Sequence, residues 1–198
     1  MGGKLASSMM SLWGWAAFAA LVGAMATSFI TEVGLLDYPI FAMFMTRSTV
    51  DPPKEAWTPR ETAEMHIQDY LRNPRKKVLI IVGPRASGKS TIARHALRDV
   101  SGAAFVDPTG QDGLRKQLLV AVGMPFAGRF TNIGRPALVR MFEFAIWWKR
   151  RKGDKKWMPT ILVDMNKESN AKEIKDALVT LKILAHDGRA CKAILVLS

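Results

Sequence analysis

The sequence predicts an α/β fold, a parallel sheet with flanking helices, preceded by an N-terminal transmembrane helix. Three observations support this prediction. Mainly apolar runs of the kind found in buried parallel strands recur at 77–82, 160–164 and 193–198. Segments with helical periodicity and helix-start signals alternate with these runs. An uncharged apolar stretch at 11–30 is long enough to cross a bilayer as a helix.

Composition and charge narrow the functional classes. The chain has 198 residues, of which 48% are hydrophobic, so one packed domain, alone or with an appendage, is expected and disorder is excluded. The single cysteine excludes a disulfide framework and a cysteine-rich zinc site. The net charge is +12, and 26 of the 29 basic residues lie in 57–198. Such a basic domain indicates an anionic partner: a nucleotide, a nucleic acid or an acidic lipid surface.

The N-terminal segment, residues 1–46, is predicted to associate with a membrane. No residue is charged between Lys4 and Glu32, and a helix over about 11–31 would be about 30 Å long, which matches the hydrocarbon layer. Trp13 and Trp15 fit an interfacial anchor. A single-pass transmembrane helix is therefore expected.

Other interpretations of this segment stay open. Ala24-Met25-Ala26 offers a signal-cleavage pattern. An organelle-targeting segment is open because the first 31 residues contain no acidic residue, although they contain no arginine either, and a buried hairpin or core helix is the remaining alternative. The run at 33–45 is too short to span a membrane, so we expect an interfacial or protein-packed segment there. The proline pair and polar residues of 47–57 indicate a linker to a core at 58–198.

The core begins with a helix and a strand. Thr58-Pro59-Arg60-Glu61 has the capping-box pattern, with Thr58 at the N-cap and Pro59 in the first helical position, and the helix should run to about Leu71. Asn73-Pro74 ends it. The run 77–82 then predicts a central parallel strand.

A phosphate-binding motif follows this strand directly. Residues 83–90, GPRASGKS, match G-x-x-x-x-G-K-[ST] in full, and residues 91–98 continue as a helix. The glycines allow backbone N–H groups to surround a phosphate at the positive end of that helix. Lys89 is expected to bridge the β- and γ-phosphates, and the Ser90 hydroxyl to bind Mg²⁺. The expected nucleotide contacts are Gly83, Pro84, Arg85, Ala86, Ser87, Gly88, Lys89, Ser90 and Thr91.

A second acidic anchor for the metal is expected at Asp164. It ends the apolar run 160–164, the pattern of a Walker B strand. Between the two motifs we expect a short strand at 104–108 and helices near 110–122 and 136–150. A second capping-box pattern at 170–173 opens a helix that should end near residue 188, and a last strand follows at 193–198.

Taken together, residues 58–198 resemble the ATP-binding core of the additional-strand P-loop NTPases, in particular the AAA+ and STAND branches. The resemblance implies a parallel sheet in the spatial order 5-1-4-3-2, with its fifth strand missing here, and ATP and Mg²⁺ as cofactors. It implies Lys89 and Asp164 as catalytic residues and places Ser198 at the position of the sensor-1 polar residue. ATP is expected rather than GTP because the chain has no N-K-x-D sequence.

The chain departs from this family beside the Walker B aspartate. Efficient ATPases of the family carry Glu directly after it to orient the attacking water, whereas Met165 and Asn166 follow here. Glu168 is the nearest carboxylate and the candidate catalytic base, although the sequence favours a glutamate on a surface loop, because its geometry is unspecified. We therefore expect weak or atypical ATP hydrolysis. A homo-oligomer or a partner protein is expected to complete the sheet, because an uncovered edge strand invites pairing.

A basic cluster at 149–156 contains six cations in eight residues and follows an apolar helix. Acidic phospholipid and nucleic acid are both candidate partners, and a solvated loop at the end of a helix is the alternative. Nucleic acid is not favoured, because Trp147 and Trp148 belong to a mainly apolar helix.

The combined expectation is a membrane-anchored, ATP-binding nucleotide-dependent switch or ATPase. The nucleotide-binding part would lie in an ATP-containing compartment, either the cytoplasm or an organelle interior such as the mitochondrial matrix. One alternative is a non-catalytic membrane-linked scaffold that keeps ATP structurally. Another is a small nucleoside or metabolite kinase, for which Arg129, Arg135 and Arg140 are the candidate lid residues.

Overall fold

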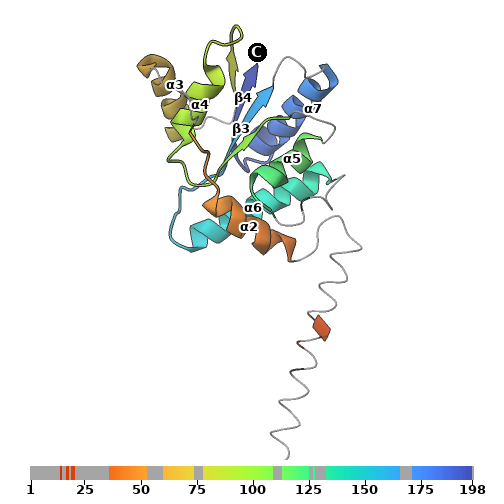
Figure 1. Cartoon of the computed structure of the whole chain (residues 1–198). Coiled ribbons are helices and arrows are strands. Elements are labelled where there is room, and N and C mark those ends of the chain that lie inside the picture. Colours follow the sequence, from red (N-terminus) through yellow and green to blue (C-terminus); the bar gives the residue numbers. More distant parts are fainter. Residues whose placement is uncertain are drawn as a thin grey trace, which may run out of the picture.

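A computed structural model shows a four-stranded sheet with helices on both faces (Figure 1). The structure describes residues 36–52, 60–73, 78–108, 113–124, 133–165 and 171–197, together with residues 14, 17, 19, 20 and 127. The strands are β1 (Leu79–Val82), β2 (Ala103–Val106), β3 (Thr160–Met165) and β4 (Lys192–Leu197). All three strand pairs are parallel, and the order is β1-β4-β3-β2.

This strand order is the one that the resemblance implied for the four strands, 1-4-3-2. The pairing register brings the carboxyl ends of the strands to one edge, since Val82 pairs with Leu197 and Met165 pairs with Leu197 from the other side. The predicted α/β class and parallel sheet are therefore confirmed. In parallel sheets the loops at this edge form the binding sites.

One face of the sheet carries α3 (Glu61–Arg72) and α4 (Lys89–Leu97). Ile67 and Leu71 of α3 and Ile92 of α4 pack with Leu162 of β3 and Val196 of β4. Arg60 precedes α3, so this helix begins two residues later than predicted, without a capping side chain in the described residues. The expected N-cap, residue 58, lies outside these residues.

The opposite face carries a larger core. Its helices are α2 (Asp37–Arg47), α5 (Leu114–Ala121), α6 (Arg135–Arg151) and α7 (Ala171–Lys182), which continues into the π-helical turn η2 (Ile183–Asp187). Phe41 of α2 and Phe142 of α6 are fully buried, and their ring centroids lie 5.0 Å apart. Helix α2, the first helix of the packed unit, is held in place by its packing on α6 (Figure 1).

The packed unit therefore starts before the predicted boundary at residue 58. Phe41 and Met45, which the prediction assigned to the membrane segment 1–46, lie in the main core. Val50 of the predicted linker 47–57 is buried against the α3 and α4 face. The Ser48 carbonyl also accepts a hydrogen bond from Gly102 N at 2.9 Å. Of the two expectations for residues 33–45, the protein-packed segment agrees with the structure.

The predicted transmembrane helix finds no support in the structure. Within the part of the chain that is described, no helix is both long and apolar enough to cross a bilayer. Nearly all of residues 11–31 lie outside that part. The transmembrane helix therefore stays a sequence-based prediction.

The amino end of the sheet is held by a close contact between Gly102 and Trp157. Gly102 has φ +80°, and a Cβ atom added there would lie 2.4 Å from a ring carbon of Trp157. The indole of Trp157 donates a hydrogen bond to the Ser101 carbonyl at 3.1 Å. Glycine is required at position 102 both by its backbone conformation and by the indole ring.

β1 is an edge strand in the described part of the sheet. Its Ile80 and Val82 side chains are 46% and 72% exposed, whereas Leu79 and Ile81 pack against the α3 and α4 face. Among the residues that the structure describes, one face of β1 thus lacks the helical cover that the neighbouring strand β4 has.

Candidate functional site

The glycine-rich loop 83–90 connects β1 to α4 at the carboxyl edge of the sheet. Two of its residues have left-handed backbone, Ala86 with φ 56° and Gly88 with φ 78°. Gly88 is the N-cap of α4, and its carbonyl accepts the first helical hydrogen bond from Ile92 N at 2.9 Å. Left-handed residues of this kind turn successive N–H groups toward one concave side, which is how such loops hold an anion.

Lys89 lies inside this loop. It is only 8% exposed, and its Nζ donates hydrogen bonds to the carbonyls of Gly83 at 2.8 Å and Pro84 at 2.6 Å and to the Ser87 hydroxyl at 3.3 Å. A buried ammonium is stable only with such partners. Because a lysine has three donor hydrogens and no fixed fork, it can exchange these carbonyls for phosphate oxygens.

The room left by Gly83 and a hydrogen bond from a second cation, Arg60, also determine the conformation of the loop. A Cβ atom at Gly83 would lie 3.4 Å from the Lys89 side chain, so the glycine leaves room for the lysine. Arg60, at the start of α3, donates a hydrogen bond from Nη1 to the Ser87 carbonyl at 2.6 Å. This bond ties the loop to a helix that is 27 residues away in sequence.

The amino end of α4 adds its own positive field. Its first turn contains no acidic residue, so no side chain there offsets the helix dipole. The Ser90 side chain is in this turn and is half-buried. The free N–H groups, the dipole and Lys89 together make the loop suitable for a phosphate group.

Asp164 lies at the carboxyl end of β3, at the same edge as the loop. Successive residues of a strand point to opposite faces, so Asp164 points to the face of Leu162, which packs against α4. The structure thus places this carboxylate on the side of the sheet that carries the helix of the glycine-rich loop. The two residues predicted to bind Mg²⁺, Ser90 of α4 and Asp164 of β3, therefore belong to the same side of the sheet.

A second carboxylate that the sequence analysis did not single out lies beside Asp164. Asp107 follows β2, whose last residue, Val106, pairs with Val163. Partial burial raises the pKa of Asp107, and the negative charge of Asp164 raises it further. The sequence signal was the short apolar run ending in Asp, which matches the end of the β3 run.

Met165, directly after Asp164, is 2% exposed and packs into the large core on the other face. It provides no group for chemistry. The candidate base Glu168, the neighbouring Asn166 and the expected sensor-1 residue Ser198 lie outside the described residues. Arg60 was also missed as a site residue, because its sequence position gives no sign of the contact with Ser87.

The metal site implied by the resemblance would need few protein ligands. Among the residues that the structure describes, no three histidine, cysteine, aspartate or glutamate side chains gather in a metal site. Magnesium bound with a nucleotide characteristically takes one or two protein oxygens together with phosphates and water. Ser90 and Asp164 are suitable donors, and the buried Lys89 within the loop shows a cationic cradle that fits a phosphate.

No family model, no curated protein and no solved structure matches the chain. The function is therefore inferred from the geometry of the loop and the sheet.

Proposed function

We propose that the chain is an ATP-binding P-loop NTPase of the AAA+/STAND type, a nucleotide-dependent switch tethered to a membrane by its N-terminal segment. The observation that carries this proposal is the buried Lys89 inside the loop 83–90, at the carboxyl edge of a parallel sheet. The loop would hold the phosphates through its N–H groups and Lys89. Ser90 and Asp164 would hold Mg²⁺.

The strand order supports this proposal. The strand that carries Asp164 is separated from the strand of the loop by β4. This insertion is the arrangement that the resemblance implied for additional-strand NTPases. The loop, the carboxylate and the intervening strand therefore agree with one another, although each alone is a weaker signal.

Mg²⁺ in such a site would neutralise charge on the phosphates. The N–H groups of the loop 83–90 and Lys89 would bind the phosphates of the nucleotide. Because the buried Met165 replaces the usual water-orienting glutamate, we expect slow hydrolysis, with binding itself as the main signal.

The test is Mg-ATP binding by the full chain in detergent, measured by titration calorimetry. Lys89→Ala should weaken binding by about 100-fold or more, since charge-assisted hydrogen bonds contribute about 1.5–3 kcal/mol each. Lys172→Ala, an exposed lysine of α7, is the matched control and should have no effect. Absence of ATP binding, or equal binding by wild type and Lys89→Ala in folded protein, would refute the proposal.

A non-catalytic, ATP-retaining scaffold is the second candidate, favoured by the burial of Met165. Phosphate release under single-turnover conditions separates the two functions. The switch predicts slow turnover that is lost in Asp164→Asn. The scaffold predicts tight ATP binding with no phosphate released over many hours.

The membrane tether has a separate test. The full chain should float with neutral phosphatidylcholine vesicles and resist extraction by salt, because an apolar helix binds independently of charge. A chain that stays at the bottom of the gradient would remove the tether from the proposal and leave nucleotide binding untouched.

A further inference from the structure

The exposed cations at one end of the molecule form what we call the basic surface: Arg150, Arg151, Lys152, Lys155, Lys156 and Arg189. Five come from the end of α6 and the turn after it, and Arg189 comes from the turn before β4. Three acidic residues accompany these cations: Glu143 in the pocket that three of them line, Asp154 in the turn after α6, and Asp187, which lies two residues before Arg189 and pairs with His186. No described carboxylate forms an ion pair with any of the six cations. The charge of the basic surface is therefore available to an external anion.

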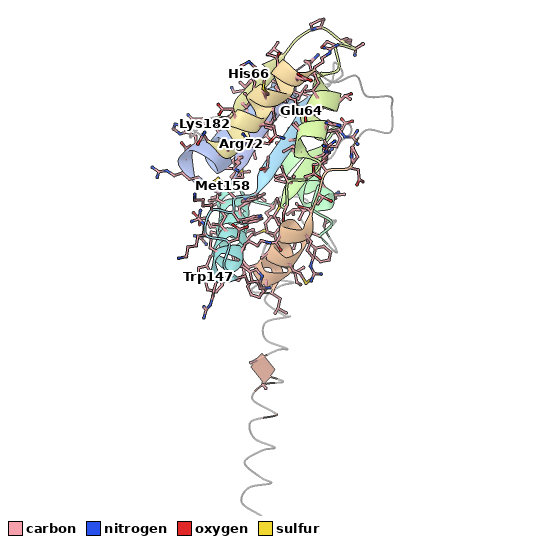
Figure 2. The ribbon with its side chains drawn as sticks, turned by 90° about the vertical axis from the view of Figure 1, so that its left-hand side faces the viewer. Glu64, His66, Arg72, Trp147, Met158 and Lys182 are labelled. Carbon is pink, nitrogen blue, oxygen red and sulfur yellow. The ribbon has the colours of Figure 1, made fainter. Side chains whose placement is uncertain are left out.

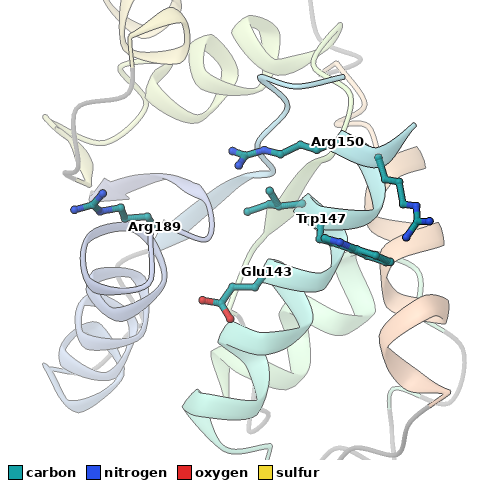
Figure 3. A pocket seen from close by; sticks show the side chains of 6 residues that line it. Glu143, Trp147, Arg150 and Arg189 are labelled. Atoms are coloured by element: carbon teal, nitrogen blue, oxygen red, sulfur yellow. The ribbon is translucent and has the colours of Figure 1, made fainter. Parts of the chain in front are cut away.

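A shallow pocket lies within the basic surface. Its volume is about 450 Å³, and its lining includes Arg150, Arg151 and Arg189 as well as Glu143 and Trp147. Figure 3 shows Glu143 and Arg150 extending from α6 toward the segment that carries Arg189. Arginine side chains that line a hollow of this kind suit a phosphate or carboxylate headgroup, because a guanidinium group can donate two hydrogen bonds in one plane.

Exposed apolar side chains accompany the cations. Trp147 is 50% exposed, and the Arg151 guanidinium lies 5.4 Å from its ring centroid. Lys152 Nζ lies 4.8 Å from the Trp148 ring. Leu36 and Met43, exposed at 37% and 39%, belong to the α2 segment that packs on α6. Tryptophan with adjacent cations is typical of a protein surface in the headgroup layer of a membrane.

The basic surface lies at the opposite end of the sheet from the loop 83–90. The end of α6 leads into the start of β3, and Arg189 precedes the start of β4. In Figure 1 the arrowheads of β3 and β4 point away from α2 and α6, and Figure 2 shows Trp147 at the far end from Glu64 and His66 of α3. An anion bound here is therefore separate from a nucleotide at the loop.

We propose that the basic surface binds acidic phospholipid headgroups and holds this end of the folded unit against an anionic membrane. The proposal rests on the membrane tether proposed above for its choice of lipid. The uncharged run 11–30 ends six residues before Leu36, and Leu36 leads directly into the α2 helix that packs on α6. A membrane that holds residues 11–30 is thus within reach of this helix pair. Nucleic acid would use the same charge but leaves the exposed Leu36 and Met43 without a role.

The experiment uses a fluorescent probe in the full chain. Burial raises the pKa of the native thiol, Cys191, so in an Asp154→Cys variant the exposed new thiol should be labelled selectively with an environment-sensitive dye. We expect the emission to rise about twofold when vesicles contain about 30% phosphatidylserine instead of phosphatidylcholine alone. Addition of about 0.5 M NaCl should reverse most of the rise.

Matched variants make the result specific. Arg150→Glu with Arg151→Glu should abolish the rise. Lys172→Glu with Lys175→Glu changes the net charge by the same amount on α7 and should leave it intact. Thermal unfolding by circular dichroism verifies that both double variants fold. Equal emission in the two kinds of vesicle, or an equal rise in both double variants, would overturn the proposal.

Two further outcomes identify other causes. If single-stranded RNA raises the emission without vesicles and the lipid does not, the partner is nucleic acid and the lipid proposal is wrong. If the chain fails to float with neutral vesicles but shows the phosphatidylserine-dependent rise, the tether is wrong and the basic surface is supported. Binding of ATP is measured separately and has no bearing on either result.

Discussion

The two ends of the sheet hold their cations in opposite ways. At the carboxyl edge, Lys89 is buried and donates to the carbonyls of Gly83 and Pro84. At the amino edge, the arginines and lysines of the basic surface are exposed and unpaired with any described carboxylate. The first arrangement selects an anion by shape and fixed donors, whereas the second attracts any dense negative charge.

The two ends of the sheet also differ in the surroundings of one glycine at each end. Gly88 at the carboxyl edge and Gly102 at the amino edge both have left-handed backbone, with φ of +78° and +80°. A Cβ atom would meet no atom within 4 Å at Gly88, but it would meet Trp157 at 2.4 Å at Gly102. The backbone at Gly88 thus faces open space, where a ligand could enter, whereas the backbone at Gly102 is packed against the indole of Trp157.

The glycine pair gives the largest expected effect. Gly102→Ala should lower the free energy of unfolding by about 3 kcal/mol or more, because backbone strain adds to the clash with Trp157. Gly88→Ala should cost only about 1 kcal/mol, from backbone strain alone. Chemical denaturation followed by circular dichroism measures both. Equal losses would show that the two ends are packed alike.

Salt should separate the two anion sites. Raising NaCl from about 0.05 to about 0.5 M should weaken the contact of the basic surface with phosphatidylserine vesicles by about tenfold or more, because exposed charges are screened. Binding of Mg-ATP at the loop should weaken by less than about threefold, since Lys89 is buried within the loop. Parallel losses in the two titrations would contradict the distinction between the sites.

The contribution of Arg60 tests whether the loop is held from outside. Arg60→Ala removes the 2.6 Å hydrogen bond to the Ser87 carbonyl and should weaken Mg-ATP binding by about fivefold, close to 1 kcal/mol. Arg72→Ala, at the other end of α3, is the matched control and should leave the affinity unchanged. If both variants bind as the wild type does, the loop is positioned without α3.

The smallest effect concerns Asp107. Its raised pKa means that the folded state holds this proton more tightly than the unfolded state, so stability falls as the pH rises from about 4 through the folded pKa. Asp107→Asn should therefore raise stability at neutral pH by about 0.5 kcal/mol or less, and the gain should vanish below about pH 4. Denaturation curves at several pH values check this, and a loss of stability at pH 7 would contradict it.

Much of the sheet could be predicted because buried parallel strands have a strong local signal. The apolar runs at 160–164 and 193–198 correspond to β3 and β4, and the loop motif marked the junction of β1 and α4. A continuous apolar strand and a glycine-rich loop are each defined by a few adjacent residues. Both can therefore be predicted from a single sequence.

The errors arose where tertiary contacts decide the structure. Asp37 and Pro39 interrupt the apolar run at 33–45, yet α2 forms there because Phe41 packs against Phe142, about a hundred residues away. Proline is tolerated in the first turn of a helix, where its missing N–H has no partner to lose. The hydrogen bond from Arg60 to Ser87 and the charge repulsion between Asp107 and Asp164 also join distant segments. No local pattern encodes such contacts.

Helix α3 has a mechanical consequence, because it is fastened at both of its ends. Arg60 holds the Ser87 carbonyl, while at the other end Tyr70 exchanges hydrogen bonds with Ala193 and Lys192 donates to the Leu71 carbonyl. Twelve helical residues make a strut about 18 Å long between these attachments. A movement of the loop backbone on nucleotide binding would therefore be transmitted through α3 to the beginning of β4, which follows Arg189 in the chain.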